Sequence, residues 1–235
     1  MLGTLRPPLV ARLRAPGWRR AAAAAAVVAV LLPVYWWGLR DPAVGLYHDD
    51  GIYAVTAKAL AEGRGYRIVS LPEEPPQTKY PIVFPFLLSL VWRVFPAFPQ
   101  NLFWLKLAPF LSAVVWLWLS YRLLAGESKN SCAAPTLVLL TAASGRIVLF
   151  STTLLSETLF AALATGALLL LRGIEQGDQS RSALAASAVL ATAAFLTRTA
   201  IPGAIPLFRT QGAARRGSES VSALLLAGSG IESGR

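Results

Sequence analysis

The sequence predicts an all-α fold, a polytopic bundle of transmembrane helices with a juxtamembrane amphipathic helix in its first outer loop. Of the 235 residues, 55% are hydrophobic and 14% are charged, whereas soluble domains carry about 25% charged residues. The mean hydropathy is +0.54. So few charges cannot cover the surface of a soluble fold, and the chain is too apolar for intrinsic disorder. Long apolar runs separated by short polar segments complete the prediction.

The composition also excludes several kinds of site. The single cysteine, Cys132, excludes a disulfide framework and a cysteine-based zinc site, and the single histidine, His48, excludes a histidine-cluster metal site. The net charge of +10 comes from basic residues that flank apolar runs, which is typical of membrane topology signals and not of a nucleic-acid partner. The sequence contains no glycine-rich phosphate loop and no nucleophile elbow.

Residues 21–39 form the first predicted span. At about 1.5 Å per residue, an α-helix of this length crosses the core of a bilayer. Arginines precede the run, and Trp36 and Trp37 lie near its end. The positive-inside rule therefore places a basic segment, residues 1–20, in the cytoplasm. A cleaved signal peptide is the alternative, but no small-x-small cleavage site follows the run.

Residues 41–80 are polar and form the predicted first outer loop. One stretch within them is amphipathic at helical spacing, and its apolar face is made by Ile52, Val55, Thr56, Ala59 and Leu60. Asp49 or Asp50 is expected to cap the start of this helix, and Gly63 to end it. A short helix that lies on the membrane surface has this pattern. Residues 71–76 contain prolines and are expected to be extended.

Three of the later apolar runs predict full spans, at residues 103–124, 133–155 and 159–171. Residues 81–96 make a shorter run that contains Arg93, so we expect them to dip into the membrane or lie at its surface. If this segment does not cross, the positive-inside rule is met by a multi-pass topology in which the basic loops are cytoplasmic.

The last part of the sequence is less regular. The run at residues 183–208 contains Arg198 and two prolines, which predicts two half-length segments in place of one straight helix. The predicted transmembrane domain therefore covers residues 21–208. Residues 209–235 are rich in Gly, Ser and Ala and form a predicted irregular tail, which is expected for a truncated or frame-shifted chain.

A few polar residues carry the candidate chemistry. Asp49 and Asp50 are adjacent carboxylates that can accept a proton from a hydroxyl or share a divalent cation, or else only favour the helix N-terminus. Lys79 lies where the chain re-enters lipid, and it can bind a lipid-linked phosphate or simply extend to the headgroups. Glu157 and Arg198 either pair or line a cavity for an anionic substrate. The preferred topology gathers all five at the outer face.

The order of these motifs is distinctive. They read Asp-Asp-Gly-Ile-Tyr at residues 49–53, Lys-Tyr-Pro at 79–81, Ser-Glu at 156–157 and Phe-Leu-Thr-Arg-Thr at 195–199. Over residues 20–208 the chain resembles the GT-C membrane glycosyltransferases. In particular, it resembles the bacterial branch related to the protein O-mannosyltransferases and the aminoarabinose transferase of lipid A.

The resemblance implies an enzyme of the bacterial inner membrane. Such an enzyme transfers a sugar from a polyprenyl-phosphate donor to the hydroxyl of a lipid, glycan or protein acceptor at the outer face. The family pattern makes Asp49 the catalytic carboxylate, with Asp50 beside it and Tyr53 at the matching spacing. Lys79 would contact the lipid phosphate, although Tyr80 stands before the proline that follows Lys79 directly in some relatives. No cofactor is certain, and a divalent cation would lie at Asp49 and Asp50.

The remaining site residues and the rival function follow from charge and length. Tyr53, Tyr80, Glu157 and Arg198 join Lys79 as candidate substrate-binding residues. Family members continue through more spans, so the chain is expected to be the N-terminal portion of such an enzyme. The rival interpretation is a non-enzymatic transporter or flippase fragment, whose acids would lie within spans near the bilayer midplane. The two aspartates fall in a loop, which favours the enzyme.

Overall fold

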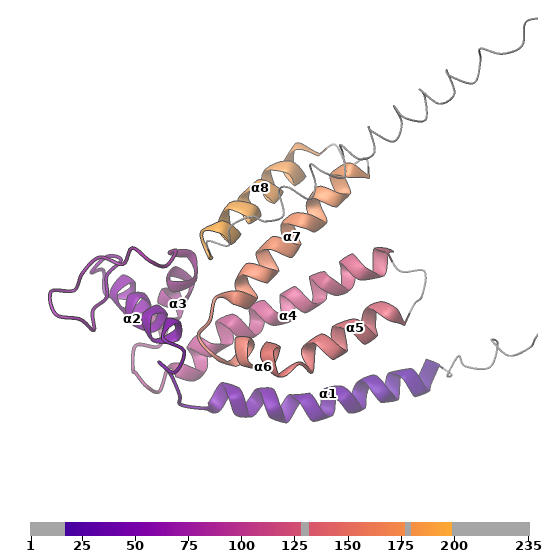
Figure 1. Cartoon of the computed structure of the whole chain (residues 1–235), viewed down its shortest axis with the longest axis horizontal. Coiled ribbons are helices and arrows are strands. Elements are labelled where there is room, and N and C mark those ends of the chain that lie inside the picture. The colour runs from indigo at the N-terminus through magenta and orange to yellow at the C-terminus, as the bar shows by residue number, and fades with distance from the viewer. Residues whose placement is uncertain (1–16, 128–131, 177–179, 199–235) are drawn as a thin grey trace, which may run out of the picture. The chain divides into compact units, whose positions relative to one another are not determined.

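A computed structural model of the chain describes residues 17–127, 132–176 and 180–198. These residues fold into α-helices, with no β-strand among them, which confirms the all-helical prediction for this part of the chain (Figure 1). In chain order the helices are α1 Gly17–Arg40, α2 Asp49–Ala61, α3 Val83–Val94, α4 Leu102–Glu127, α5 Ala133–Ala142, α6 Gly145–Thr152, α7 Glu157–Glu175 and α8 Arg181–Phe195. The chain divides into two compact units after Thr199, and all the described residues belong to the first.

In the part of the chain that the structure describes, two single helices are long and apolar enough to cross a membrane, and both were predicted. They are α4 and α7, which cover the predicted spans at residues 103–124 and 159–171. The two pack along each other and α7 packs against α8, as Figure 1 shows. The Thr158 hydroxyl of α7 donates to the Pro109 carbonyl of α4 at 2.9 Å. This contact is buried, so it joins the two candidate spans directly.

The first predicted span corresponds to α1. Its apolar stretch Ala25–Arg40 is shorter than a membrane crossing, so a span at residues 21–39 stays a prediction. Gly38 allows α6 to come close, since a Cβ added there would lie 2.8 Å from the Thr152 side chain. Residues 1–16 of the predicted cytoplasmic segment lie outside the described residues.

The predicted span at residues 133–155 is not one straight helix, although its two parts together are long and apolar enough to form a broken span. The structure divides this run into α5 and α6, which are bent by 63° relative to each other. Ser144 adopts an extended backbone at the break, and Gly145 begins the next helix. The Tyr35 hydroxyl of α1 donates to the Ala142 carbonyl at 2.8 Å. This bond satisfies one of the carbonyl groups that the end of α5 leaves without a helical partner.

The helix predicted in the first outer loop is present as α2, with the predicted end. Gly63 has φ +74, and the amides of Gly63 and Arg64 donate to the carbonyls of Leu60 and Ala59. This is the Schellman arrangement, which uses glycine in the left-handed region to end a helix. The predicted cap is wrong: the N-cap is His48, no side chain caps the helix, and both aspartates lie in the first turn.

The buried face of α2 agrees only in part with the amphipathic face that was predicted, since Thr56 and Ala59 are fully buried as expected. Its fully buried residues include Tyr53, Ala54 and Ala57, whereas Ile52 and Val55 are only half-buried. The buried face packs against α3, on which Phe84, Leu88 and Trp92 are buried. Small alanines allow this close packing, so α3 covers the buried face of α2.

α3 is too short for a straight crossing, in agreement with the prediction for residues 81–96. It has 12 residues, or about 18 Å at 1.5 Å per residue, against about 30 Å for a bilayer core. The predicted half-length segment at the start of the 183–208 run is α8, which ends at Phe195 before Arg198. Residues 199–208 and the 209–235 tail lie outside the described residues.

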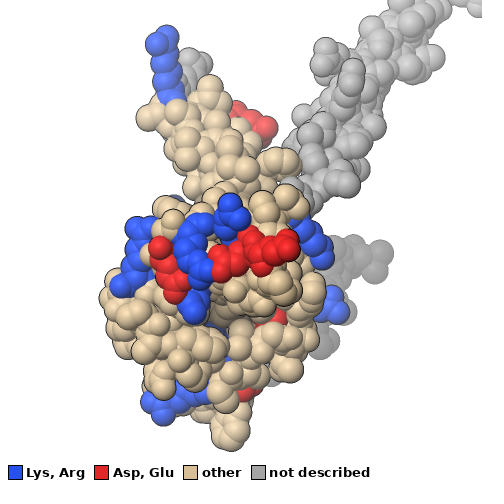
Figure 2. Space-filling model, turned by 90° about the vertical axis from the view of Figure 1, so that its left-hand side faces the viewer, with Lys and Arg blue, Asp and Glu red and all other residues tan. Residues whose placement is uncertain are grey.

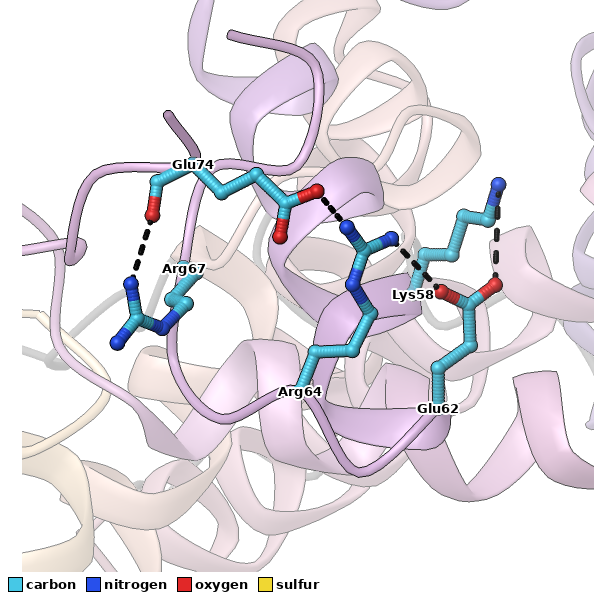
Figure 3. Close-up of polar contacts among 5 residues, drawn as sticks. All are labelled: Lys58, Glu62, Arg64, Arg67 and Glu74. Carbon is cyan, nitrogen blue, oxygen red and sulfur yellow. Dashed lines mark hydrogen bonds and ion pairs between the residues drawn. The ribbon is translucent and has the colours of Figure 1, made fainter. Parts of the chain in front are cut away.

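The connection between α2 and α3 is folded back on itself, not extended at residues 71–76. Arg67 and Pro76 form an isolated antiparallel bridge. Acidic and basic side chains gather on this face (Figure 2). Arg64 pairs with both Glu62 and Glu74, and Arg67 donates to the Glu74 carbonyl at 3.1 Å (Figure 3). These exposed ion pairs add little stability each, but together with the bridge they hold the loop that leads to Lys79.

Candidate functional site

The structure brings most of the predicted site residues together at the N-terminal end of α2. The Tyr80 hydroxyl donates to Oδ1 of Asp49, 31 residues away in sequence. The contact joins the segment that precedes α3 to the first turn of α2. Negative charge is favourable in the first turn of a helix because of the helix dipole. Asp49 is therefore a charged acceptor held at a defined place.

Asp50 points elsewhere and has a different role. Its carboxylate accepts hydrogen bonds from the backbone amides of Gly45 at 2.7 Å, Tyr47 at 3.1 Å and Gly51 at 2.9 Å. The residue is 2% exposed. Both carboxylate oxygens are thus used to shape the turn before α2. The geometry favours Asp49 over Asp50 as the acid that meets a substrate.

Lys79 and Tyr80 lie on a segment whose backbone is held on both sides. The amide of Lys79 donates to Oε1 of the buried Gln77 at 2.8 Å. The Tyr66 hydroxyl donates to the carbonyls of Tyr80 at 2.9 Å and Pro81 at 3.2 Å. Nζ of Lys79 lies 4.8 Å from the centre of the Tyr80 ring, within cation–π distance. The lysine is otherwise open to solvent.

Both side chains of this segment hold their protons more firmly than usual. Contact with the Tyr80 side chain raises the pKa of Lys79, and the charge of Asp49 adds to the effect. Burial raises the pKa of Tyr80, and so does the hydrogen bond that it donates to Asp49. At neutral pH, Lys79 is therefore a cation and Tyr80 is a neutral hydrogen-bond donor.

Tyr53 connects this segment to the start of α7. Its ring lies edge-on to Tyr80 at 5.2 Å and to Phe84 at 5.1 Å. Its hydroxyl shares a buried hydrogen bond of 3.1 Å with Ser156. Burial raises the pKa of Tyr53, and the hydrogen bond with Ser156 opposes this only in part. Tyr53 is thus a buried support of the site, and substrate does not reach it directly in this structure.

Glu157 and Arg198 form an ion pair. Pairing of these two residues was one of the two alternatives that the sequence left open. Burial lowers the pKa of Arg198, but the hydrogen bond and charge of Glu157 more than offset this, and the pKa is raised overall. Tyr53 and Asp49 also contribute to this rise, so the pair lies within reach of the charge of Asp49. Oε2 of Glu157 is buried and has no hydrogen-bond partner among the described residues.

The arrangement supplies a base and two cations. A carboxylate can accept the proton of a hydroxyl, and Lys79 and Arg198 can stabilise negative charge on a phosphate. The acidic pair offers little to a divalent cation, since the oxygens of Asp50 are taken by backbone amides. Within the described ranges, no three acidic, cysteine or histidine side chains come together.

Sequence reasoning did not place three supporting residues, Tyr66, Gln77 and Ser156, in the site. Each is polar but uncharged, and each acts through one or two hydrogen bonds. Such a contact leaves no pattern in the sequence. The buried Lys106 was also missed, although a lysine within an apolar run is a visible signal.

An apolar groove of about 870 Å³ lies between α3, α4 and α7. Its walls include Leu87 and Val91 of α3, Leu111 of α4 and Leu163 of α7. Leu159, two residues after Glu157, also lines it. The groove therefore runs along α7 from the N-terminal end of this helix, where Glu157 lies.

Comparison of this chain with protein-family models, with curated proteins and with solved structures found no match. The function of this chain is therefore inferred from its own residues. The contact between Tyr80 and Asp49 and the ion pair of Glu157 with Arg198 are the observations that bear on it most directly.

Proposed function

We propose that this chain is a membrane glycosyltransferase of the GT-C type. It takes a sugar from a polyprenyl-phosphate donor and gives it to an acceptor hydroxyl at the outer face of a bacterial inner membrane. The observation that carries the proposal is the hydrogen bond from Tyr80 to Asp49. It puts a carboxylate and the cation Lys79 on adjoining segments, which are the two kinds of group that this transfer needs.

The residues take the following roles. The acceptor oxygen attacks the anomeric carbon of the sugar while Asp49 takes the hydroxyl proton. The bond between that carbon and the phosphate oxygen breaks, and the electron pair leaves with the polyprenyl phosphate. Lys79 and Arg198 stabilise the phosphate charge that develops, and Glu157 orients Arg198 through their ion pair. Direct displacement inverts the anomeric configuration.

The apolar groove supports a lipid-linked donor. Its walls are almost entirely apolar, mostly leucine, valine and alanine side chains together with Phe95 and Trp104, and they include the hydroxyl residue Ser112. An isoprenoid chain gains about 25 cal/mol for each Å² of apolar surface removed from water. Leu159 lines the groove two residues after Glu157, so an isoprenoid in the groove can have its phosphate near Arg198.

The positions of the acids weigh against a transporter. Coupling-ion sites in transporters place acids within spans near the bilayer midplane. The candidate spans α4 and α7 carry acids only at their ends, at Glu127, Glu157 and Glu175. The described parts of α1, α5 and α6 contain none. Asp49 instead begins α2, a helix of 13 residues, which is too short to cross.

The test is sugar transfer by the purified chain in proteoliposomes. The donors are radiolabelled polyprenyl-phosphate mannose and polyprenyl-phosphate aminoarabinose, and the acceptors are the lipids of bacterial inner membranes. Asp49→Asn should lower transfer by about 100-fold or more, since general-base catalysis contributes about that much. Binding of polyprenyl phosphate should persist in this variant.

Glu73→Gln is the matched control, because Glu73 is an exposed acid at the tip of the loop between α2 and α3. It should transfer as the wild type does. Absence of transfer by the wild-type chain from either donor, or full transfer by Asp49→Asn, would contradict the proposed function.

A further inference from the structure

We infer that Tyr80 is a positioning residue for Asp49, an inference that rests on the proposed function. The Tyr80 hydroxyl donates to Oδ1 of Asp49. Among the described residues, no other hydrogen bond reaches the carboxylate of Asp49. The bond therefore fixes one oxygen and leaves Oδ2 free to meet the acceptor hydroxyl.

Tyr80 is held in place without the help of Asp49. Tyr66 donates to its backbone carbonyl at 2.9 Å, and the buried Tyr53 packs against its ring at 5.2 Å. Gln77 holds the preceding residue through a bond of 2.8 Å. These contacts hold the ring of Tyr80 and the backbone around it, so the carboxylate follows the tyrosine and not the reverse.

The direction of the hydrogen bond is also set by chemistry. Burial keeps the pKa of Tyr80 above its ordinary value, so the phenol stays protonated over the range in which a carboxylate is ionised. A carboxylate that accepts from a neutral donor keeps its charge and its remaining lone pairs. Asp49 can therefore still act as a base while its plane is fixed.

The ring of Tyr80 has a second contact, with Lys79. Nζ of Lys79 lies 4.8 Å from the ring centre. The hydroxyl of one side chain thus orients the base, and its ring orients a cation for the donor phosphate. Two substitutions separate these effects, since Tyr80→Phe keeps the ring and loses the hydroxyl, whereas Tyr80→Leu loses both.

The experiment measures transfer kinetics for the wild type, Asp49→Asn, Tyr80→Phe, Tyr80→Leu and Tyr47→Phe in proteoliposomes with the donors above. Tyr80→Phe should lower kcat by about 10- to 100-fold, because a misplaced catalytic group costs about this much. Its KM for donor should stay within about twofold. Tyr80→Leu should lower kcat equally and raise the donor KM by about two- to fivefold, the value of a lost cation–π contact.

Tyr47→Phe is the control, since Tyr47 is a half-exposed tyrosine two residues before Asp49. An infrared difference spectrum supplies a readout that does not depend on turnover. The carboxylate band that Asp49→Asn removes should shift in Tyr80→Phe and stay unchanged in Tyr47→Phe.

The outcomes separate the two claims. An unshifted band together with wild-type kcat in Tyr80→Phe overturns the positioning role and leaves the proposed function standing, provided that Asp49→Asn is inactive. No transfer by the wild type, or full transfer by Asp49→Asn, overturns the proposed function and the inference with it. A reduced kcat with a shifted band and an unchanged donor KM supports both.

Discussion

At the scale of single residues, the buried Lys106 shows how a charge is accommodated inside this chain. The residue is 1% exposed. Its Nζ donates to the carbonyl of Asp41 at 2.6 Å and approaches that of Gly38 at 3.4 Å. These carbonyls lie at the C-terminal end of α1, where helical partners are missing and a positive charge is favoured. Lys106 therefore ties α4 to the end of α1 in front of the loop that carries Asp49.

Replacement of Lys106 by methionine should lower the free energy of unfolding by about 1–3 kcal/mol, since buried carbonyl groups lose their donor. Thermal unfolding in detergent, followed by tryptophan fluorescence, measures the change. Lys58→Met is the matched control, because Lys58 has a 46% exposed side chain and forms only a 3.8 Å pair with Glu62. Equal unfolding temperatures for the two variants would contradict a stabilising contact of Lys106 with the end of α1.

The raised pKa values of Lys79 and Tyr80 predict binding that does not change with pH near neutrality. A lysine whose pKa is raised stays protonated to higher pH than usual, so its attraction for phosphate is lost only on strongly alkaline titration. Affinity for a polyprenyl-phosphate sugar should therefore be constant between about pH 7 and pH 9.

Binding is measured by co-sedimentation of the donor with proteoliposomes. Lys79→Ala should weaken it by about tenfold at each pH, the value of one charge-assisted contact. A steady decline across the range in the wild type would show that Lys79 is not the cation that holds the phosphate.

At the scale of elements, small residues determine how closely the helices approach. Gly38 brings α1 against α6. Gly166 of α7 faces Leu190 of α8, where an added Cβ would lie 3.2 Å from a methyl group. Close approach through glycine is typical of helix packing in membranes. There the hydrophobic effect does not drive helices together, and close van der Waals packing does so instead.

Gly38→Ala should therefore destabilise the fold. The added Cβ would lie 2.8 Å from three atoms of the Thr152 side chain, and overpacking of this kind costs about 1–3 kcal/mol. Gly173→Ala is the control, because nothing lies within 4 Å of that position in α7. Alanine there should be neutral or stabilising, as it is in exposed helices. A chain in which Gly38→Ala unfolds at or above the wild-type temperature would contradict this packing.

The sequence predicted a helix correctly where an apolar run is long enough to require one. The long runs that became α4 and α7 are clear examples. The break at Ser144 was missed because the run from 133 to 155 is apolar on both sides, and one Ser-Gly step is a weak signal. The buried face of α2 was predicted only in part, because Ala54 and Ala57 are weakly apolar and the position of α3 decides which face is covered.

At the scale of the whole molecule, the candidate site is assembled from segments far apart in sequence. The charged residues Asp49, Lys79, Glu157 and Arg198 were predictable because a charge stands out in an apolar chain. The pairing of Glu157 with Arg198 was one of two alternatives, but the bond from Tyr80 to Asp49 was not predicted; the two contacts span 41 and 31 residues. Long-range contacts of this kind depend on the packing of α2, α3 and α7.

The membrane topology is the remaining prediction. It can be tested by chemical labelling of cysteine, because the sequence contains a single cysteine. The positive-inside rule puts the loop between α4 and α5 in the cytoplasm and the loop between α2 and α3 outside. α4 is long enough to cross the membrane, and it separates these two loops in the chain. Cys132, the single cysteine of the sequence, lies at the first of them.

A membrane-impermeant maleimide should therefore leave the wild-type chain unlabelled in intact spheroplasts and label it after lysis. Leu71→Cys combined with Cys132→Ala should be labelled in intact spheroplasts, because Leu71 is exposed in the loop between α2 and α3, which the rule places outside. The reverse pattern would put Asp49 and Lys79 in the cytoplasm. Donors whose sugar lies at the outer face would then be out of reach, so the same labelling decides whether the proposed reaction has its substrates on the correct side.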